Sequence, residues 1–164
     1  MTMSVDALVS SLQPLAFGAP PPYTAAEFAA LAGDVELPHA WHDLETQIRN
    51  VIAEERARLN AARGKGETEA ARWQRPAAGC DLYWQNRARA AMAEKDTLRR
   101  DEAIDRLFWD AAGELTPVAS PLSHGALETY AIRLAIAQKR AALSTEAGNA
   151  AFTRLVSKTA LPEI

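Results

Sequence analysis

The feature that most constrains the fold is a pair of amphipathic helical patterns in the second half of the chain. The first reads AIDRLFWDAAGELT (residues 103–116), and the second reads ALETYAIRLAIAQKRAAL (residues 126–143). Apolar side chains in the first recur at intervals of three and four, which places them on one face of an α-helix. They are Ile104, Leu107, Phe108, Ala111 and Leu115. Neither segment carries a catalytic grouping, so the pair predicts a helical scaffold.

Composition extends this prediction to the whole chain. About a fifth of the 164 residues are alanine, and β-branched residues are sparse, which favours helix over sheet. Apolar residues make up 48% of the chain, enough to form the core of one domain. We therefore predict an all-α protein with a single domain over residues 1–164, a bundle or array of about six helices.

The first part of the chain combines an irregular arm with a well-marked helix start. Residues 1–23 predict a short helix or strand and then an extended arm, because prolines and glycine interrupt the apolar spacing. Thr24 and Glu27 then match a capping box, the pattern that opens many helices. Gly33 predicts the end of this helix.

The longest helical pattern follows Pro38 and ends near Arg63. The tract over residues 64–80 contains glycines and few core formers, so it predicts either a mobile hinge or the tip of a long helical hairpin. We favour the hairpin tip, because Trp73 gives the returning chain a side chain to bury. Further helices are predicted from Asp81, through the two amphipathic patterns, and from Ser144 onward.

Candidate catalytic and metal-binding groups are few. His39 and His42 are three residues apart, but no second ligand pair lies at a recognisable spacing, so surface histidines are favoured over a metal site. Cys80 is more typical of a small buried apolar residue than of a nucleophile. Asp105 and neighbouring acidic residues alternate with arginines, a pattern typical of a solvated helix face. We predict no enzyme activity, no metal and no cofactor.

Charge and hydropathy narrow the classes of partner. The net charge of -3 and the pI near 5.6 give no overall signal for nucleic acid. No apolar run approaches the roughly 20 residues that cross a bilayer, so we predict no direct membrane insertion. A single cysteine and the lack of a signal-peptide pattern favour the cytoplasm.

Protein partners are the favoured class. Arginines give the predicted hairpin a locally basic surface, suited to an acidic protein partner more than to nucleic acid. Exposed aromatic side chains would mark the interface, because aromatic residues are enriched at binding hot spots. The predicted partner-binding residues are Trp73, Trp84, Arg56, Arg63, Arg72 and Phe17.

Two segments resemble a known family. The opening ALVSSLQPLAFGAPPPYTAAEF and the two amphipathic patterns are similar to domain-of-unknown-function family 2764, bacterial helical proteins associated with V-type ATPase operons. The markers are the small-residue arm, the Trp109–Asp110 pair, and the helix from Tyr130 to Arg140. They are packing and loop signatures, less specific than a metal or nucleotide motif.

The resemblance implies a non-enzymatic component or assembly factor of a V-type ATPase, with a role like that of the helical socket that joins the rotating shaft to the membrane ring. Its partners would be V-type ATPase subunits, and its place would be the cytoplasm, peripheral to the membrane through a complex. One alternative is a helical adaptor unrelated to ATPases. A small helical enzyme is the other, and it requires His39, His42 or Cys80 to converge in one cleft.

Overall fold

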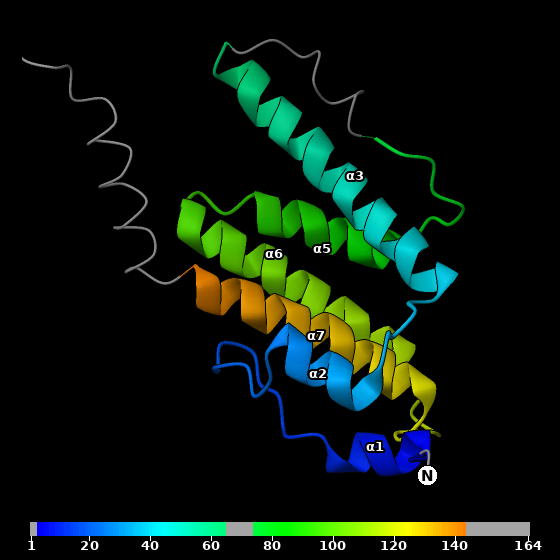
Figure 1. The fold of residues 1–164 in the computed structure, drawn as a ribbon. Helices are drawn as coiled ribbons and strands as arrows, with labels where there is room; N and C mark the ends of the chain where they lie inside the picture. Colours follow the sequence, from blue (N-terminus) through cyan, green and yellow to red (C-terminus); the bar gives the residue numbers. More distant parts are fainter. Residues whose placement is uncertain (1–2, 65–73, 144–164) are drawn as a thin grey trace, which may run out of the picture.

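The computed structural model describes residues 3–64 and 74–143, and in this part of the chain it contains six α-helices, one short 3₁₀ helix and no strand (Figure 1). The predicted all-α class is confirmed. The elements are α1 (Val5–Ser11), α2 (Ala25–Ala32), α3 (His39–Ala62), α5 (Leu82–Met92), α6 (Thr97–Ala112), η2 (Gly113–Leu115) and α7 (His124–Ala142).

Local signals fix both ends of α2. The side chain of Thr24 accepts a hydrogen bond from the Glu27 N–H at 3.2 Å, and Glu27 Oε2 accepts one from the Thr24 N–H at 2.7 Å. Hydrogen bonding by Thr24 also holds the pKa of Glu27 below its ordinary value. Gly33 ends the helix with φ of 69°, in the left-handed region that favours glycine. The predicted capping box and helix end are both confirmed.

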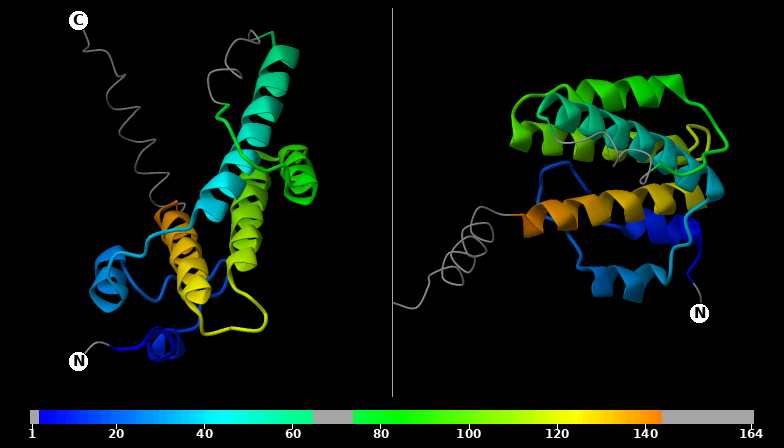
Figure 2. Two further views of the ribbon diagram at one scale, coloured as in Figure 1. Left: turned by 90° about the vertical axis from the view of Figure 1, so that its right-hand side faces the viewer. Right: turned by 90° about the horizontal axis from the view of Figure 1, so that it is seen from above.

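The helices are arranged around α6. Helix α5 packs against both α3 and α6, and α6 packs against α7 (Figure 1). The short helix α1 lies against α7, and α2 covers another part of α7 (Figure 2). Helix α3 thus rests on α5 at one side of the bundle, while α7 and the N-terminal arm form the other side.

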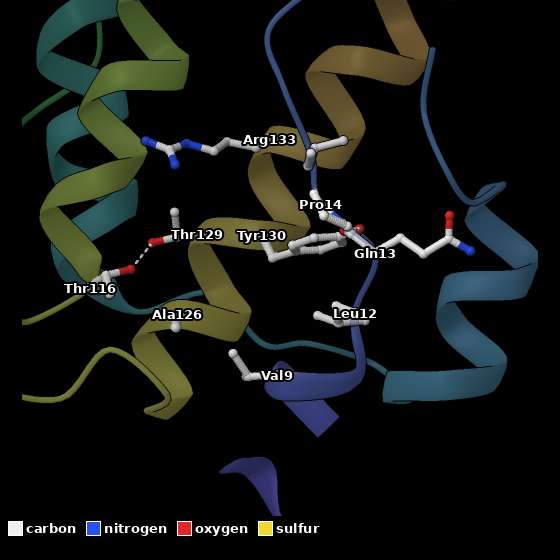
Figure 3. A pocket seen from close by; sticks show the side chains of 10 residues that line it. Val9, Leu12, Gln13, Pro14, Thr116, Ala126, Thr129, Tyr130 and Arg133 are labelled. Carbon is white, nitrogen blue, oxygen red and sulfur yellow. Dashed lines mark hydrogen bonds between the residues drawn. The ribbon is translucent and has the colours of Figure 1, made fainter. Parts of the chain in front are cut away.

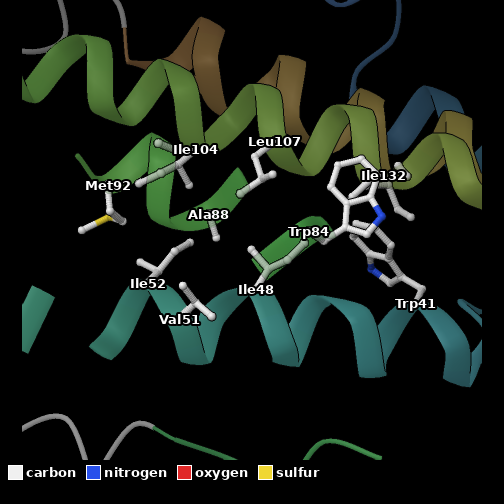
Figure 4. Close-up of a cluster of buried hydrophobic side chains, with 13 residues drawn as sticks. Trp41, Ile48, Val51, Ile52, Trp84, Ala88, Met92, Ile104, Leu107 and Ile132 are labelled. Carbon is white, nitrogen blue, oxygen red and sulfur yellow. The ribbon is translucent and has the colours of Figure 1, made fainter. Parts of the chain in front are cut away.

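The main core lies where α3, α5, α6 and α7 meet (Figure 4). It includes Ile48 and Leu107, the two largest side chains that are completely buried. The predicted stripe on α6 supplies much of this core, since Ile104, Leu107 and Ala111 are buried while Phe108 is half-buried. The stripe is therefore confirmed as a core face, and its edge at Phe108 reaches the surface.

The start of α5 corrects the prediction for Trp84. Asp81 caps this helix by accepting hydrogen bonds from the N–H groups of Tyr83 and Trp84, at 3.0 and 3.2 Å. Successive residues then point about 100° apart, so three in a row cannot all face the core. Trp84 is 4% exposed, whereas Leu82 and Tyr83 are 63% and 62% exposed. The prediction of an exposed Trp84 at a partner surface is wrong.

The N-terminal arm is packed and not free. Leu8 of α1 and Phe28 of α2 form a second core with Leu127 and Leu134 of α7. Phe17 is half-buried in the loop between them. Its ring lies edge-on to Trp109 at 5.5 Å, with the guanidinium groups of Arg106 and Arg140 at 4.0 and 4.7 Å from the ring centre.

These contacts give Phe17 a role within the fold. Its half-buried ring contacts one aromatic and two cationic side chains and so fastens the arm to α6 and α7. The partner-binding role predicted for Phe17 stays a prediction.

Residues 74–80 form an extended segment tied to the side of α3. Asn50 holds Arg75 by two hydrogen bonds, one to its N–H at 2.9 Å and one to its carbonyl oxygen at 2.7 Å. The carboxylate of Asp43 accepts hydrogen bonds from the N–H groups of Ala78 and Gly79. The returning chain is thus attached along α3 before α5 begins. Residues 65–73, with Arg72 and Trp73, lie outside the described residues, as does the helix predicted from Ser144.

This attachment predicts a pH dependence. The hydrogen bonds, that of Ala78 first, hold the pKa of Asp43 below its ordinary value of 3.8. Because the folded-state pKa is the lower one, the stabilisation is complete above about pH 3.8 and is lost as the pH falls through the folded-state pKa. In Asp43→Asn this part of the acid dependence should be absent. Urea titrations from about pH 6 to about pH 2.5 measure it.

Asp101→Asn is the control, because Asp101 is exposed on α6 and accepts no such hydrogen bonds in the described part of the chain. It should retain the acid dependence of the parent protein. Acid destabilisation of the same size in Asp43→Asn and the parent would contradict the role assigned to this carboxylate.

Candidate functional site

Among the described residues, a groove of about 1220 Å³ lies between α3 on one side and α6 and α7 on the other. Its lining is continuous along one face of α3, from Trp41 to Asn60. Arg75 of the extended segment adds to the same rim. We call this feature the α3–α7 groove.

The floor of the α3–α7 groove is apolar. Phe108 of α6 and Ile136 of α7 are half-buried there, beside Trp41, Ile52 and Ile132, which belong to the main core. The groove is therefore an open edge of that core. Its apolar side chains keep part of their surface in contact with water, and covering them would be favourable.

The sequence explains why α7 lines a groove as well as a core. Leu127 and Leu134 lie on the side of α7 that the N-terminal arm covers. Ile132 and Ile136 lie on another side and face α3. Helix α7 is therefore apolar on more than one side. Because α5 supports α3 from its other side, no described helix fills the space between α3 and α7.

Charged side chains surround this floor. On α3, Arg49 pairs with Glu45 at 2.7 Å, and its guanidinium lies 5.2 Å from the centre of the Phe108 ring. On α7, Lys139 pairs with Asp105 at 2.5 Å. Arg56 and Arg75 also line the groove, and neither has an ion pair among the described residues. Within residues 3–64 and 74–143, these two arginines are the cations of the groove without an ion pair.

Asp105 corrects a second prediction. The charge alternation predicts a solvated position for this residue, yet it is 4% exposed. Lys139 and Arg140 of α7 both donate to its carboxylate, at 2.5 and 3.3 Å. The pairing joins α6 to α7 and does not follow the i, i+4 spacing within one helix. This arrangement lets a carboxylate lie at the edge of the core, because both oxygens have cationic donors.

The dimensions of the groove suit a helix better than a small molecule. The stretch from Trp41 to Asn60 is about 28 Å long at 1.5 Å per residue. A volume of about 1220 Å³ over that length corresponds to a cross-section of roughly 40 Å². A helix with its side chains has a cross-section of roughly 80–110 Å². The groove can therefore take one face of a helix along its whole length.

A second, smaller pocket of about 290 Å³ lies between the N-terminal arm and α7 (Figure 3). Three of the polar side chains that line it have partners. The hydroxyls of Thr116 and Thr129 are 2.7 Å apart, and Arg133 donates to the carbonyl oxygen of Trp109 at 3.0 Å, pointing away from the pocket. Burial raises the pKa of Tyr130 to about 12. Arg133, the charged side chain in the lining, is directed at Trp109 of α6, so we interpret the pocket as a packing gap beneath the arm.

The residues predicted to bind a partner lie in different parts of the structure. Arg56 is exposed and lines the α3–α7 groove. Arg63 is exposed at the end of α3, outside the groove. Trp84 is buried in the main core, and Phe17 is half-buried against α6 and α7. Arg72 and Trp73 lie outside the described residues. Of the predicted interface, the structure therefore places one residue in the groove.

The residues considered for catalysis do not converge. His42 lines the α3–α7 groove, while His39 and Cys80 lie elsewhere. Within residues 3–64 and 74–143, no group of three His, Cys, Asp or Glu side chains is arranged to hold a metal ion. The described part of the chain therefore lacks the shared cleft that the enzyme hypothesis requires.

No family model matches this chain, and neither a curated protein nor a solved structure matches it. The resemblance to family 2764 therefore stays a prediction. Among the helices that the structure describes, none has the length and apolar character needed to cross a membrane.

Proposed function

We propose that this protein is a non-enzymatic binding protein that holds a helix of a protein partner in the α3–α7 groove. The observation that carries the proposal is the groove itself, which follows α3 for about 28 Å and has apolar side chains on its floor. Amphipathic helices commonly bind in such grooves by placing their apolar face on the floor. Phe108 and Ile136, both half-buried, supply apolar surface that a partner helix would cover.

The charged groups of the groove fit a binding role better than catalysis. Glu45 and Asp105 are both held by cations, at 2.7 and 2.5 Å, so each carboxylate is already neutralised. His42 also lines the groove, but neither His39 nor Cys80 lines it with His42, so the catalytic candidates do not act together there. The groove instead presents a fixed apolar surface with a charged rim.

The resemblance to family 2764 suggests which partner to test first. We propose subunits of a V-type ATPase, with this chain as a component or assembly factor in the cytoplasm that reaches the membrane only through the complex. A helical adaptor of some other assembly is the alternative. Both share the groove, and they differ in the identity of the protein bound.

A pair of variants on α7 tests the groove. Ala135 is exposed and lines the groove, whereas Ala141 is exposed on the same helix outside it. Ala135→Trp should fill the groove and abolish capture of the partner, while Ala141→Trp should leave capture unchanged. The measurement is affinity purification of the full-length tagged chain from its native cells at low salt, followed by identification of co-purified proteins.

The outcomes separate the two parts of the proposal. A protein captured by the parent and Ala141→Trp but lost with Ala135→Trp supports docking in the groove. If no captured protein depends on Ala135, the groove has no such role. Recovery of V-type ATPase subunits in the groove-dependent set supports that partner, and their absence from it overturns the ATPase assignment.

A further inference from the structure

We infer that the partner segment is an acidic amphipathic helix, with carboxylates that meet Arg56 and Arg75 on the rim of the α3–α7 groove. The inference rests on the proposed function and adds the chemistry of the partner. It comes from the charge of the groove, which differs in sign from that of the chain.

The lining of the groove contains four cationic side chains, Arg49, Arg56, Arg75 and Lys139, and two carboxylates, Glu45 and Asp105. The chain as a whole has a net charge of -3. A positive excess in the groove of a negatively charged protein attracts acidic segments and disfavours basic ones.

The two carboxylates account for two of the four cations. Glu45 is 2.7 Å from Arg49, and Asp105 is 2.5 Å from Lys139. Arg56 is exposed and lies on the groove side of α3, while its neighbour Arg58 pairs with the glutamates of its own helix. The excess charge is thus concentrated on the rim formed by α3 and the extended segment.

Arg75 is held in position by its backbone. Asn50 bonds to both its N–H and its carbonyl oxygen, at 2.9 and 2.7 Å, and Asn50 itself lines the groove. This places a second arginine at the rim that carries Arg56. Arginine presents several donors in a planar fork that matches a carboxylate, so both residues suit acidic side chains of a helix.

The same charges suit nucleic acid poorly. Duplex DNA carries one phosphate charge per about 1.7 Å, so about 28 Å of groove would face roughly 16 phosphates. Four cations, two of them already paired, cannot match that density. Ile136 and Phe108 also make the floor apolar, and a phosphate backbone has no apolar surface to cover it. An acidic helix with an apolar face matches both the floor and the rim.

Two synthetic peptides test the inference on the full chain. Both have about 18 residues, which as a helix span about 27 Å, with leucines at helical spacing on one face. One carries glutamate beside the leucines, and the other carries lysine at the same positions. We expect the glutamate peptide to bind about tenfold more tightly at low salt, and the difference to shrink as salt is added. Fluorescence anisotropy of labelled peptides gives the affinities.

Substitutions inside and outside the groove test where the glutamate peptide binds. Arg56→Glu should weaken binding of the glutamate peptide by about fivefold, because it removes a cation and adds a repelling charge at the rim. Arg63→Glu makes the same charge change at the end of α3 outside the groove, and should change the affinity by less than about twofold. Ala135→Trp should abolish binding of the glutamate peptide, and Ala141→Trp should not.

Several results would overturn the inference. Equal binding of both peptides, with both lost in Ala135→Trp, would leave the groove as a docking site but remove the acidic partner. Equal weakening by Arg56→Glu and Arg63→Glu would assign the effect to overall charge. Failure of the glutamate peptide to bind would reject the acidic helix, while the purification experiment would still judge the groove itself.

Separate measurements test two other possible occupants of the groove, nucleic acid and a second copy of this chain. Tighter binding of a duplex DNA about 20 base pairs long than of the glutamate peptide would overturn the inference in favour of nucleic acid. Sedimentation of the full chain tests for a second copy. A dimer that Ala135→Trp dissociates and Ala141→Trp preserves would overturn it in favour of another copy of this chain in the groove.

Discussion

Replacement of Leu107 by alanine is expected to lower the free energy of unfolding by about 2–5 kcal/mol. Leu107 lies in the middle of α6, is 2% exposed, and belongs to the main core. Its neighbours in that core include Ala88, Ala111 and Ala112, which are too small to fill the cavity left behind. The loss therefore combines the transfer of the leucine side chain with the cost of a cavity. Urea and thermal unfolding measure it.

Two other residues of α6 serve as controls. Leu98 is 80% exposed, so Leu98→Ala should change the free energy of unfolding by no more than about 0.5 kcal/mol. Phe108 is half-buried at the edge of the groove, and Phe108→Ala should cost less than Leu107→Ala, although phenylalanine is larger. An unchanged melting temperature in Leu107→Ala would contradict its place in the core.

Leu107 and Phe108 show how far the apolar stripe of α6 predicts the structure. The spacing correctly predicts a helix and assigns both residues to its apolar face. Spacing does not reveal which neighbouring helix covers each part of that face. The core encloses Leu107, whereas Phe108 lies at the open edge between α3 and α7. The sequence pattern does not predict the groove, because the groove depends on where a covering helix is missing.

The other contacts could be predicted from the sequence when the two residues are close together in the chain, and could not when they are far apart. The capping box joins Thr24 to Glu27 within one turn, and its pattern alone predicts the hydrogen bonds observed. Asp105 is paired with Lys139 across two helices, and no local pattern connects them. Arg75 reaches the rim only because Asn50, 25 residues earlier, holds its backbone. The available sequence signal is an asparagine within the α3 pattern followed 25 residues later by an arginine, and it is weak.

Replacement of Trp84 by alanine is expected to lower the free energy of unfolding by about 3–5 kcal/mol. The indole is 4% exposed and packs in the main core with residues of α3. One of its faces is covered by Arg87, whose guanidinium lies 5.0 Å from the ring centre. Arg87 is fixed there by Asp110 at 2.7 Å, a hydrogen bond that also raises the pKa of the guanidinium. Alanine would remove a large core side chain and the nearer of two rings that Arg87 contacts, the other being that of Tyr83.

Tyr83→Ala is the matched control, because Tyr83 is the preceding residue of the same helix and is 62% exposed. Its ring lies edge-on to Trp84, with 4.9 Å between the ring centres, so Tyr83→Ala should lower the free energy of unfolding by about 0.5–1.5 kcal/mol, well below the loss in Trp84→Ala. Comparing these variants decides between the two roles considered for Trp84. If Trp84 is a core residue, its replacement by alanine should cause a large loss of stability. If it is a partner-binding residue, the replacement should weaken binding and leave stability unchanged. Since burial places Trp84 in the first class, a stable Trp84→Ala variant with reduced partner capture would reverse that conclusion.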